Sequence, residues 1–212
     1  MKTLIFNGSA RKNGETQSMI DALTAQLEGE YKIVNAHSCN VRACVDCRYC
    51  WEHPACSIQD GWQEIDSYLR ECDNVVIASP VYFCEITGPV LSVLSRIQVY
   101  WAAKTFRHEK LLEKPKRGGM ILLGGGQGTA TAPMNTSAVL LRQMNAKEIF
   151  DPVCCFATDH HHALEDEETM ADLKKFAQFL NRTTLIISKK PGNTGISRDI
   201  RTEFTTDLLL SD

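Results

Sequence analysis

The chain has 212 residues, of which 43% are hydrophobic and 23% charged, and its formal net charge is -3. These values are typical of a globular protein with a well-buried core, and the length suits one α/β domain. A slightly acidic chain is a poor match for nucleic acid or an anionic membrane surface, and no apolar run reaches the length of a membrane span. The N-terminus enters the predicted strand "KTLIFNGS" (2–9) directly, so we expect no signal peptide and a cytoplasmic protein.

Apolar runs rich in β-branched residues alternate with amphipathic segments along the chain. They predict strands at 2–9, 31–37, 74–80, 118–125 and 148–159, and helices at 15–27, 61–72, 88–97, 132–144 and 166–182. The strand runs lack strict alternation, as in a parallel sheet covered on both faces. We therefore predict an α/β fold in three layers, a doubly wound domain with a five-stranded parallel sheet. This domain occupies residues 1–182 and carries a Cys-rich insertion at 39–60. Residues 183–212 are expected to form a C-terminal extension, either an oligomerisation arm or a frayed end.

In such a sheet, ligands bind beyond the carboxyl ends of the strands. The loop at 7–18 follows the first strand, and its side chains that can donate hydrogen bonds to a phosphate are Ser9, Thr16, Gln17 and Ser18. Arg11 adds positive charge. The loop lacks both the dinucleotide glycine pattern and a P-loop lysine, so it suits a monophosphate at a helix N-terminus. The alternative is an ordinary helix cap made by Thr16 or Ser18.

Two further loops follow later strands. Tyr82 and Phe83 stand after the third strand, where they either flank a planar ring or form a buried aromatic pair. The loop at 123–133 contains glycines at 124, 125, 126 and 128 around Gln127. It either lets the backbone approach a heterocycle closely or is simply flexible.

Nine cysteines are present, and four of them form a compact C-x2-C-x2-C-x5-C stretch: Cys44, Cys47, Cys50 and Cys56. Without an export signal, reduced thiols are expected. Four thiolates suit either a 4Fe–4S cluster or a tetrahedral zinc ion, and the compact spacing favours the cluster. The "DHHH" run at 159–162 is interpreted as a polar loop, because adjacent histidines diverge and no spaced carboxylate partner is evident.

"GSARKNGETQ" (8–17) resembles the flavin-phosphate loop of the flavodoxin-like NAD(P)H-dependent FMN reductases, and "SPVYF…ITGP" (79–89) resembles their second loop. The order of strands and loops agrees over residues 2–181. The cysteine stretch, followed by "SIQDGWQEI", is similar to the iron–sulfur flavoprotein branch of that family.

The resemblance implies a set of residues for each part of FMN. The phosphate would be held by Ser9, Arg11, Asn13, Gly14, Thr16 and Gln17. The isoalloxazine and ribityl chain would lie along Pro80, Val81, Tyr82 and Phe83, and the ring would face Gly125, Gly126 and Gln127. No catalytic residue is expected, because the flavin carries the chemistry. Cys44, Cys47, Cys50 and Cys56 would bind a 4Fe–4S cluster, although relatives that keep part of this run bind FMN alone.

The resulting hypothesis is an FMN-dependent oxidoreductase. It would pass electrons from NAD(P)H, or from a ferredoxin-type donor, through FMN to a small-molecule or protein acceptor. The resemblance also implies a homodimer or homotetramer. The rival hypothesis is a non-enzymatic flavodoxin-like redox or metal sensor that uses the Cys44–Cys56 loop.

Overall fold

The computed structural model describes residues 1–183. The strands are β1 (Lys2–Asn7), β2 (Glu30–Asn35), β3 (Asn74–Tyr82), β4 (Glu85–Ile86), β5 (Lys116–Leu123), β6 (Ala146–Ile149) and β7 (Val153–Cys155). The helices are α1 (Glu15–Thr24), α2 (Tyr49–Glu52), α3 (Trp62–Glu71), α4 (Gly88–Leu94), α5 (Gln98–Ala102), α6 (Thr131–Gln143) and α7 (Glu167–Leu180). Short irregular turns of helix are η1 (Ser95–Ile97), η2 (Ala103–Arg107) and η3 (Ala163–Glu165). The extension predicted at 183–212 lies, apart from its first residue, outside the described residues.

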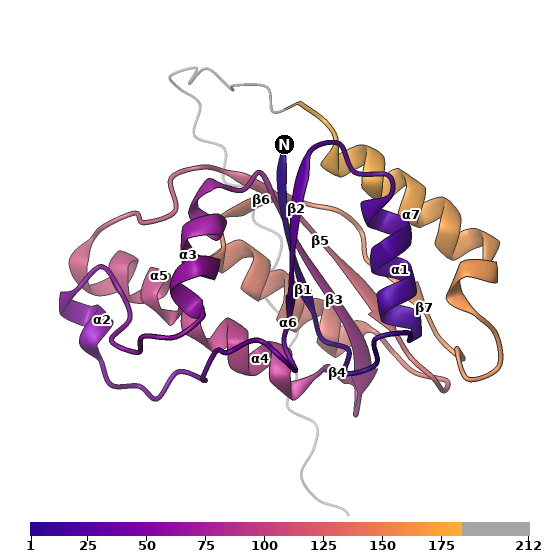
Figure 1. Cartoon of the computed structure of the whole chain (residues 1–212), viewed down its shortest axis with the longest axis horizontal. Coiled ribbons are helices and arrows are strands. Elements are labelled where there is room, and N and C mark those ends of the chain that lie inside the picture. Colours follow the sequence, from indigo (N-terminus) through magenta and orange to yellow (C-terminus); the bar gives the residue numbers. More distant parts are fainter. Residues whose placement is uncertain (184–212) are drawn as a thin grey trace, which may run out of the picture. The chain divides into compact units, whose positions relative to one another are not determined.

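A parallel sheet with the order β2-β1-β3-β5-β6 forms the centre of the fold, and β7 also pairs with β5. Helices α1 and α7 cover one face, while α3, α4, α5 and α6 lie on the other (Figure 1). This is the predicted flavodoxin-like arrangement of three layers. No helix within the described part of the chain is both long and apolar enough to span a bilayer.

Both faces of the sheet are buried, as the unbroken apolar runs predicted. In β5, Met120 and Leu122 join the core beneath α4 and α6, while Ile121 and Leu123 join the core beneath α1 and α7. Successive side chains of a strand point to opposite faces, so each strand supplies both cores. This packing fixes where the strands end, and therefore where the loops between strands and helices begin.

The fifth strand differs from its prediction at 148–159. Two shorter strands, β6 and β7, pair in parallel with the beginning and the end of β5. Pro152 separates them, because proline has no backbone N–H for the ladder and restricts the residue before it. The chain leaves the sheet after Cys155, and Ala157 adopts a positive φ of 59°.

The segment around β3 and α4 also departs from the prediction. Strand β3 runs on to Tyr82 and turns back as a hairpin with β4, which the sequence analysis did not foresee. Helical structure predicted at 88–97 continues through α5 and η2 to Arg107. The continuation buries Val99 and Tyr100 in the core. Helix α2 is a further unpredicted element, within the Cys-rich insertion.

Candidate functional site

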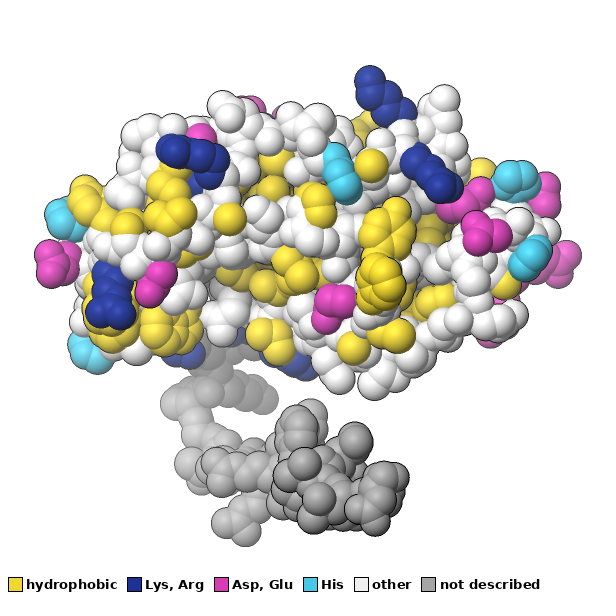
Figure 2. Space-filling model, turned by 90° about the horizontal axis from the view of Figure 1, so that it is seen from below, with side chains coloured by type: hydrophobic (Ala, Val, Ile, Leu, Met, Phe, Trp, Pro, Cys, Tyr) yellow, Lys and Arg dark blue, Asp and Glu magenta, His cyan; other side chains and the backbone are white. Residues whose placement is uncertain are grey.

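The three loops lie at one edge of the sheet, as the fold requires. Asn7 pairs with Asn35 of β2 and with Ala78 of β3, and Pro80 of β3 pairs with Leu123 of β5. The carboxyl ends of these parallel strands are therefore level. Hydrophobic side chains gather on this face of the molecule (Figure 2).

Asn7, at the end of β1, organises the first loop and was not among the predicted site residues. Its Nδ2 donates to Gln17 Oε1 and to Asn35 Oδ1, each at 2.9 Å, and its Oδ1 accepts the N–H of Ser9 at 2.9 Å. Ser9 Oγ in turn accepts the N–H of Arg11 at 3.1 Å. The signal in the sequence was an asparagine closing each of two apolar runs, at matching positions of neighbouring strands.

Helix α1 begins without a side-chain cap. Its N-cap is Gly14, so the alternative in which Thr16 or Ser18 caps the helix is wrong. Ser18 instead donates its hydroxyl to the carbonyl of Gly14 at 3.3 Å. The N–H of Ser18 donates to the carbonyl of Gly14 at 3.0 Å, whereas nothing among residues 1–183 accepts the N–H groups of Glu15, Thr16 and Gln17. Such a terminus, with the exposed Arg11 before it, has the donors and the partial positive charge that bind an anion.

Gly8 brings the ends of β1, β2 and β3 together. Its carbonyl accepts the hydroxyl of Thr87 at 2.9 Å and lies 3.2 Å from His37 Nε2. A Cβ added at Gly8 would lie 2.7 Å from Ser79 Oγ, so only glycine fits here. Thr87 and His37 carry no pattern that would have singled them out, because their role depends on the fold.

Tyr82 and Phe83 form the tip of the β3–β4 hairpin. Phe83 is fully exposed and Tyr82 is 53% exposed, so a buried aromatic pair is wrong. The two central residues of the turn, Phe83 and Cys84, have φ of 51° and 60°. A two-residue hairpin with positive φ at both positions favours Asn-Gly, so the Phe-Cys pair is held in a strained backbone.

The glycine loop after β5 is held by the segment that follows β7. The N–H groups of Ala157, Thr158 and Asp159 donate to the carbonyls of Gly126, Gly124 and Gly125, each at 3.0 Å. This ladder argues against the alternative of a simply flexible loop. Gly124 and Gly125 face crowded surroundings, since added Cβ atoms would lie 2.4 Å from the Phe156 ring and 2.6 Å from the Asp159 carboxylate.

The histidine run attaches this segment to α1. Glu15 accepts the N–H of Ala163 at 2.8 Å and lies 2.8 Å from His162 Nδ1. Burial raises the pKa of the Glu15 carboxyl, but the bonds to His162 and Ala163 outweigh it, so the pKa is lower than usual. The hydrogen bond to Glu15 raises the pKa of His162. The prediction that this run has no carboxylate partner is wrong, because Glu15 reaches it from far away in the sequence.

The four cysteines of the insertion line one small cavity together with Arg96. Arg96 is buried and pairs with Asp60 at 2.8 Å, and it donates to the carbonyls of Arg42 at 3.0 Å and Ile58 at 3.1 Å. Its Nε is buried without a partner in the described structure. The N–H of Gly61 donates to the carbonyl of Asn40 at 2.7 Å, so the two ends of the insertion meet.

The thiols of this cavity differ in their surroundings. Burial, with the nearby Cys44 sulfur, raises the pKa of the Cys50 thiol. A hydrogen bond between the Cys47 thiol and the Ser57 hydroxyl lowers the pKa of Cys47, and the N–H of Tyr49 lowers it further. Among residues 1–183, no three of the four sulfurs lie within 4.8 Å of one another. A single zinc ion with Zn–S bonds of about 2.3 Å would hold tetrahedral sulfurs about 3.8 Å apart.

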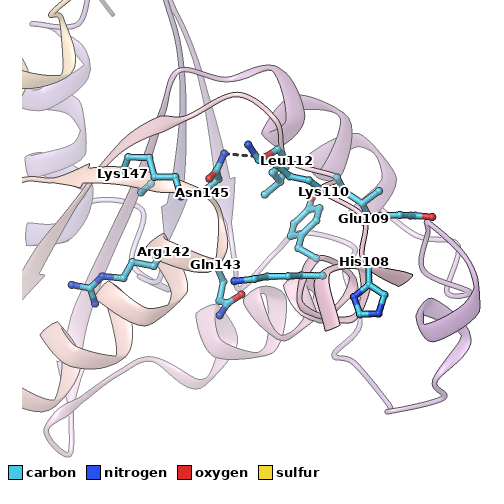
Figure 3. Close-up of a pocket in the computed structure, with 12 residues that line it drawn as sticks. His108, Glu109, Lys110, Leu112, Arg142, Gln143, Asn145 and Lys147 are labelled. Carbon is cyan, nitrogen blue, oxygen red and sulfur yellow. Dashed lines mark hydrogen bonds between the residues drawn. The ribbon is translucent and has the colours of Figure 1, made fainter. Parts of the chain in front are cut away.

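A basic groove of about 860 Å³ lies at the opposite, amino edge of the sheet, where α6 ends and β6 begins. Arg142 projects from α6 and Lys147 from β6, and Lys110 and His108 line the far wall (Figure 3). None of the predicted flavin residues or the four cysteines lines this groove. It is therefore separate from the candidate site at the carboxyl edge.

Comparison with known proteins identifies the family of this chain. The model of the family described as NADPH-dependent FMN reductase matches residues 1–161. An iron-sulfur flavoprotein of Archaeoglobus fulgidus is 30% identical over 131 residues, which are 60% of this chain and 56% of that protein. Another, from Methanocaldococcus jannaschii, is 28% identical over 136 residues, 61% of this chain and 67% of that one. The chain thus matches little more than half the length of the first relative.

Solved structures show the same fold. The NAD(P)H:quinone oxidoreductase from Methanothermobacter marburgensis has a TM-score of 0.67 at 10% identity, covering 87% of this chain and 98% of that chain. An FMN-dependent NADH-azoreductase from Bacillus anthracis, in complex with FMN, has a TM-score of 0.62 at 13% identity, covering 86% and 100%. These neighbours confirm the prediction of a flavodoxin-like α/β fold.

Proposed function

The chain belongs to the NADPH-dependent FMN reductase family, and from this premise we propose that it binds FMN at the carboxyl edge of the sheet and transfers electrons through it. NAD(P)H or a ferredoxin-type protein is the proposed donor, and a small molecule or protein the acceptor. The family consists of FMN-dependent oxidoreductases that use a nicotinamide. The uncapped N-terminus of α1, level with the ends of β3 and β5, is the observation that carries the proposal.

The FMN phosphate would occupy the first loop. The free N–H groups at the start of α1, which include that of Thr16, can donate hydrogen bonds to an anion. The side chain of Arg11 is exposed and adds a positive charge beside them. The side chain of Gln17 is already engaged by Asn7 and Asp21, so it shapes the loop as well as facing the ligand. The proposed phosphate residues are Ser9, Arg11, Asn13, Gly14, Thr16 and Gln17.

The isoalloxazine would lie between the second and third loops. The carbonyls of Gly125 and Gly126 are taken by the ladder to residues 157–159, while their own N–H groups have no acceptor in the described structure. These N–H groups and Gln127 are suited to the polar edge of a heterocycle. Pro80, Val81, Tyr82 and Phe83 would contact the ring and the ribityl chain from the other side.

Bound FMN would supply hydride and single-electron chemistry that no side chain offers. We assign no catalytic residue of the chain. The residues at the carboxyl edge would bind the phosphate and orient the ring.

We further propose that Cys44, Cys47, Cys50 and Cys56 bind a 4Fe–4S cluster. All four line one cavity, and the unpartnered Nε of the buried Arg96 is a donor suited to thiolate or sulfide. Their wide spacing suits a cluster better than one zinc ion, because each thiolate of a cluster binds a different iron. The names of the relatives point the same way.

Anaerobic purification tests both cofactors at once. We expect a yellow-brown protein that releases FMN on denaturation and contains about four iron and four sulfide per chain, as a 4Fe–4S cluster requires. A colourless protein that fails to bind added FMN would contradict the flavin site. Zinc in place of iron, or neither metal, would contradict the cluster and leave the flavin proposal standing.

A variant separates flavin turnover from a purely sensory role. Alanine at Ser9, Arg11 and Thr16 together should weaken FMN binding at least tenfold and lower NADPH oxidation with quinone or nitro acceptors at limiting FMN. Lys12→Ala is the matched control, since Lys12 is an exposed cation of the same loop. If the triple variant oxidised NADPH as fast as wild type, the flavin would have to bind at another site. FMN binding without turnover would favour the sensor hypothesis.

The assembly stays a proposal as well. We expect a homodimer or homotetramer, and the fully exposed Phe83 and half-exposed Tyr82 provide apolar surface beside the flavin edge. Light scattering during size-exclusion chromatography of the FMN-loaded protein measures the mass directly. A monomer of about the mass of the chain, 23.7 kDa, would contradict this expectation.

A further inference from the structure

A second group of metal-ligating side chains lies behind the glycine loop. Cys155 at the end of β7, His161 in the following loop and Asp166 at the N-cap of α7 each bring a ligand atom within 4.8 Å of the other two. Cys155 Sγ lies 3.5 Å from His161 Nε2. We propose that these three residues form a mononuclear site for a transition-metal ion, with Zn²⁺ as the expected occupant.

The donor set suits zinc. One thiolate, one imidazole and one carboxylate are ligands that zinc accepts together, whereas Mg²⁺ and Ca²⁺ require oxygen. Three protein ligands would leave one tetrahedral position open. A cavity adjoins the three residues and is lined by the acidic side chains of Glu168 and Asp172 as well. The fourth position would therefore be filled by water or by one of these carboxylates.

The geometry differs from that of a nucleophilic triad. In a Cys-His-Asp triad the imidazole stands between the thiol and the carboxylate, and its two nitrogens face in different directions. Here the sulfur and the carboxylate oxygen are themselves within 4.8 Å of each other. The three atoms thus surround a common point, which is the arrangement of ligands around an ion.

The ligands are supported by their surroundings. Asp166 Oδ1 accepts the N–H of Thr169 at 2.7 Å, which leaves its second oxygen for the metal. Thr169 also donates its hydroxyl to the carbonyl of Cys154 at 3.3 Å, joining α7 to β7. Such contacts orient metal ligands and are needed for affinity.

The position of the site gives it a structural role. The segment between Cys155 and Asp166 holds the glycine loop through residues 157–159 and holds α1 through Ala163 and Glu15. An ion bound by Cys155, His161 and Asp166 would fasten both ends of this segment to the fold. Because the metal would bind only the folded form, it would stabilise this segment and, through it, the loops proposed to bind the flavin.

Zinc binding by the FMN-loaded full chain tests the inference. The variants are Cys155→Ser, His161→Gln and Asp166→Asn, and the chain supplies matched controls in Cys154→Ser and His160→Gln, which alter the neighbouring residue of the same type. After equilibrium dialysis against buffered zinc, we expect wild type and controls to hold one zinc per chain more than the variants. Zinc affinity should fall at least tenfold in His161→Gln.

The absorption spectrum of bound Co²⁺ shows whether a thiolate is among the ligands. Co²⁺ bound by wild type should show a thiolate-to-metal charge-transfer band that is weaker in Cys155→Ser and unchanged in Cys154→Ser, because only the first variant removes a proposed ligand. The Cys44–Cys56 thiols are common to all these proteins, so any metal that they bind cancels in the difference. Circular dichroism confirms that His161→Gln folds. Equal zinc in wild type and in folded His161→Gln, or a charge-transfer band of equal intensity in wild type and Cys155→Ser, would overturn the site whether or not FMN is bound.

Discussion

The carboxyl edge of the sheet, called the flavin edge because we propose that FMN binds there, and the cysteine insertion are built in different ways. At the flavin edge, strand register and backbone hydrogen bonds fix the loops, as in the ladder from residues 157–159 to the glycine loop. The insertion has one short helix, α2, and depends on side chains, above all on Arg96. A site made from strand ends is prepared by the fold, whereas a site in an insertion depends on a few distant residues.

The largest expected effect is that of Arg96→Met, which should destabilise the insertion and leave the flavin edge intact. Arg96→Met leaves the Asp60 carboxylate, whose side chain is 4% exposed, without its cation. Removing one partner of a buried pair costs about 3–5 kcal/mol in the free energy of unfolding. Urea denaturation measures that loss, and iron content should fall further than FMN content.

Arg70→Met is the control for that experiment. Arg70 pairs with Asp66 at 3.0 Å, but both side chains are partly exposed. A pair of this kind contributes about 0–1 kcal/mol. If both arginine variants lost the same stability, the buried pair would contribute no more than the exposed one. If Arg96→Met lost FMN as readily as iron, the two regions would not be independent.

A substitution of Gly124 should have the reverse outcome, with FMN binding weakened and the insertion unaffected. A Cβ at Gly124 would lie 2.4 Å from the Phe156 ring, and overpacking of this kind costs about 1–3 kcal/mol. Gly124→Ala should therefore lower the unfolding free energy and weaken FMN binding, with iron content unchanged. Gly88→Ala is the control, because a Cβ there meets nothing within 4 Å. Fluorescence titration with FMN checks the affinity, and unchanged affinity in Gly124→Ala would contradict a role for this loop.

At the hairpin tip, in contrast to Gly124→Ala, a substitution should raise the stability of the protein. Cys84 has φ of 60°, a conformation that costs a residue with a Cβ about 1 kcal/mol and that glycine adopts freely. Cys84→Gly should raise the melting temperature by about 2–4 °C. Cys84→Ser keeps the Cβ and should leave it unchanged. If the melting temperature rose in both variants, the effect would come from removal of the thiol and not from relief of the backbone.

The smallest effect concerns the Glu15–His162 contact at the flavin edge. Since the pKa of His162 is raised above 6.5, its contribution is complete below that pH and is lost as the pH rises through the raised pKa. Since the pKa of Glu15 is below 4.5, the contribution is also lost as the pH falls through that lowered value. NMR titration should show the His162 pKa falling toward 6.5 in Glu15→Gln. An unchanged pKa would mean that the contact does not form in solution.

The sequence predicted the fold and the edge of the sheet that carries the loops. Apolar runs such as 74–80 are long and β-rich, and each is followed by a helical pattern, so the parallel order followed from general rules. The strand ends then placed the loops at 7–18 and 123–133 together. The split of β6 from β7 was not predicted, although Pro152 is a signal in the sequence that could have indicated it.

What the sequence could not show were contacts between distant residues. Glu15 reaches His162, and Arg96 reaches Asp60, across separations that no local pattern encodes. Asp166 follows His161 closely, yet the two approach Cys155 only because β7 ends beside the first turn of α7. The hairpin was hidden for another reason, because Phe83-Cys84 does not resemble the residues that such a turn favours.

The closure of the insertion at Asn40 and Gly61 has a consequence for engineering. Because the N–H of Gly61 bonds the carbonyl of Asn40, the intervening segment leaves and re-enters the fold at nearly one point. We therefore expect that a short linker could replace the segment without displacing the strands on either side of it. Asp60 would be lost with the segment, so the shortened protein would need an uncharged residue in place of Arg96, whose ion pair is with Asp60.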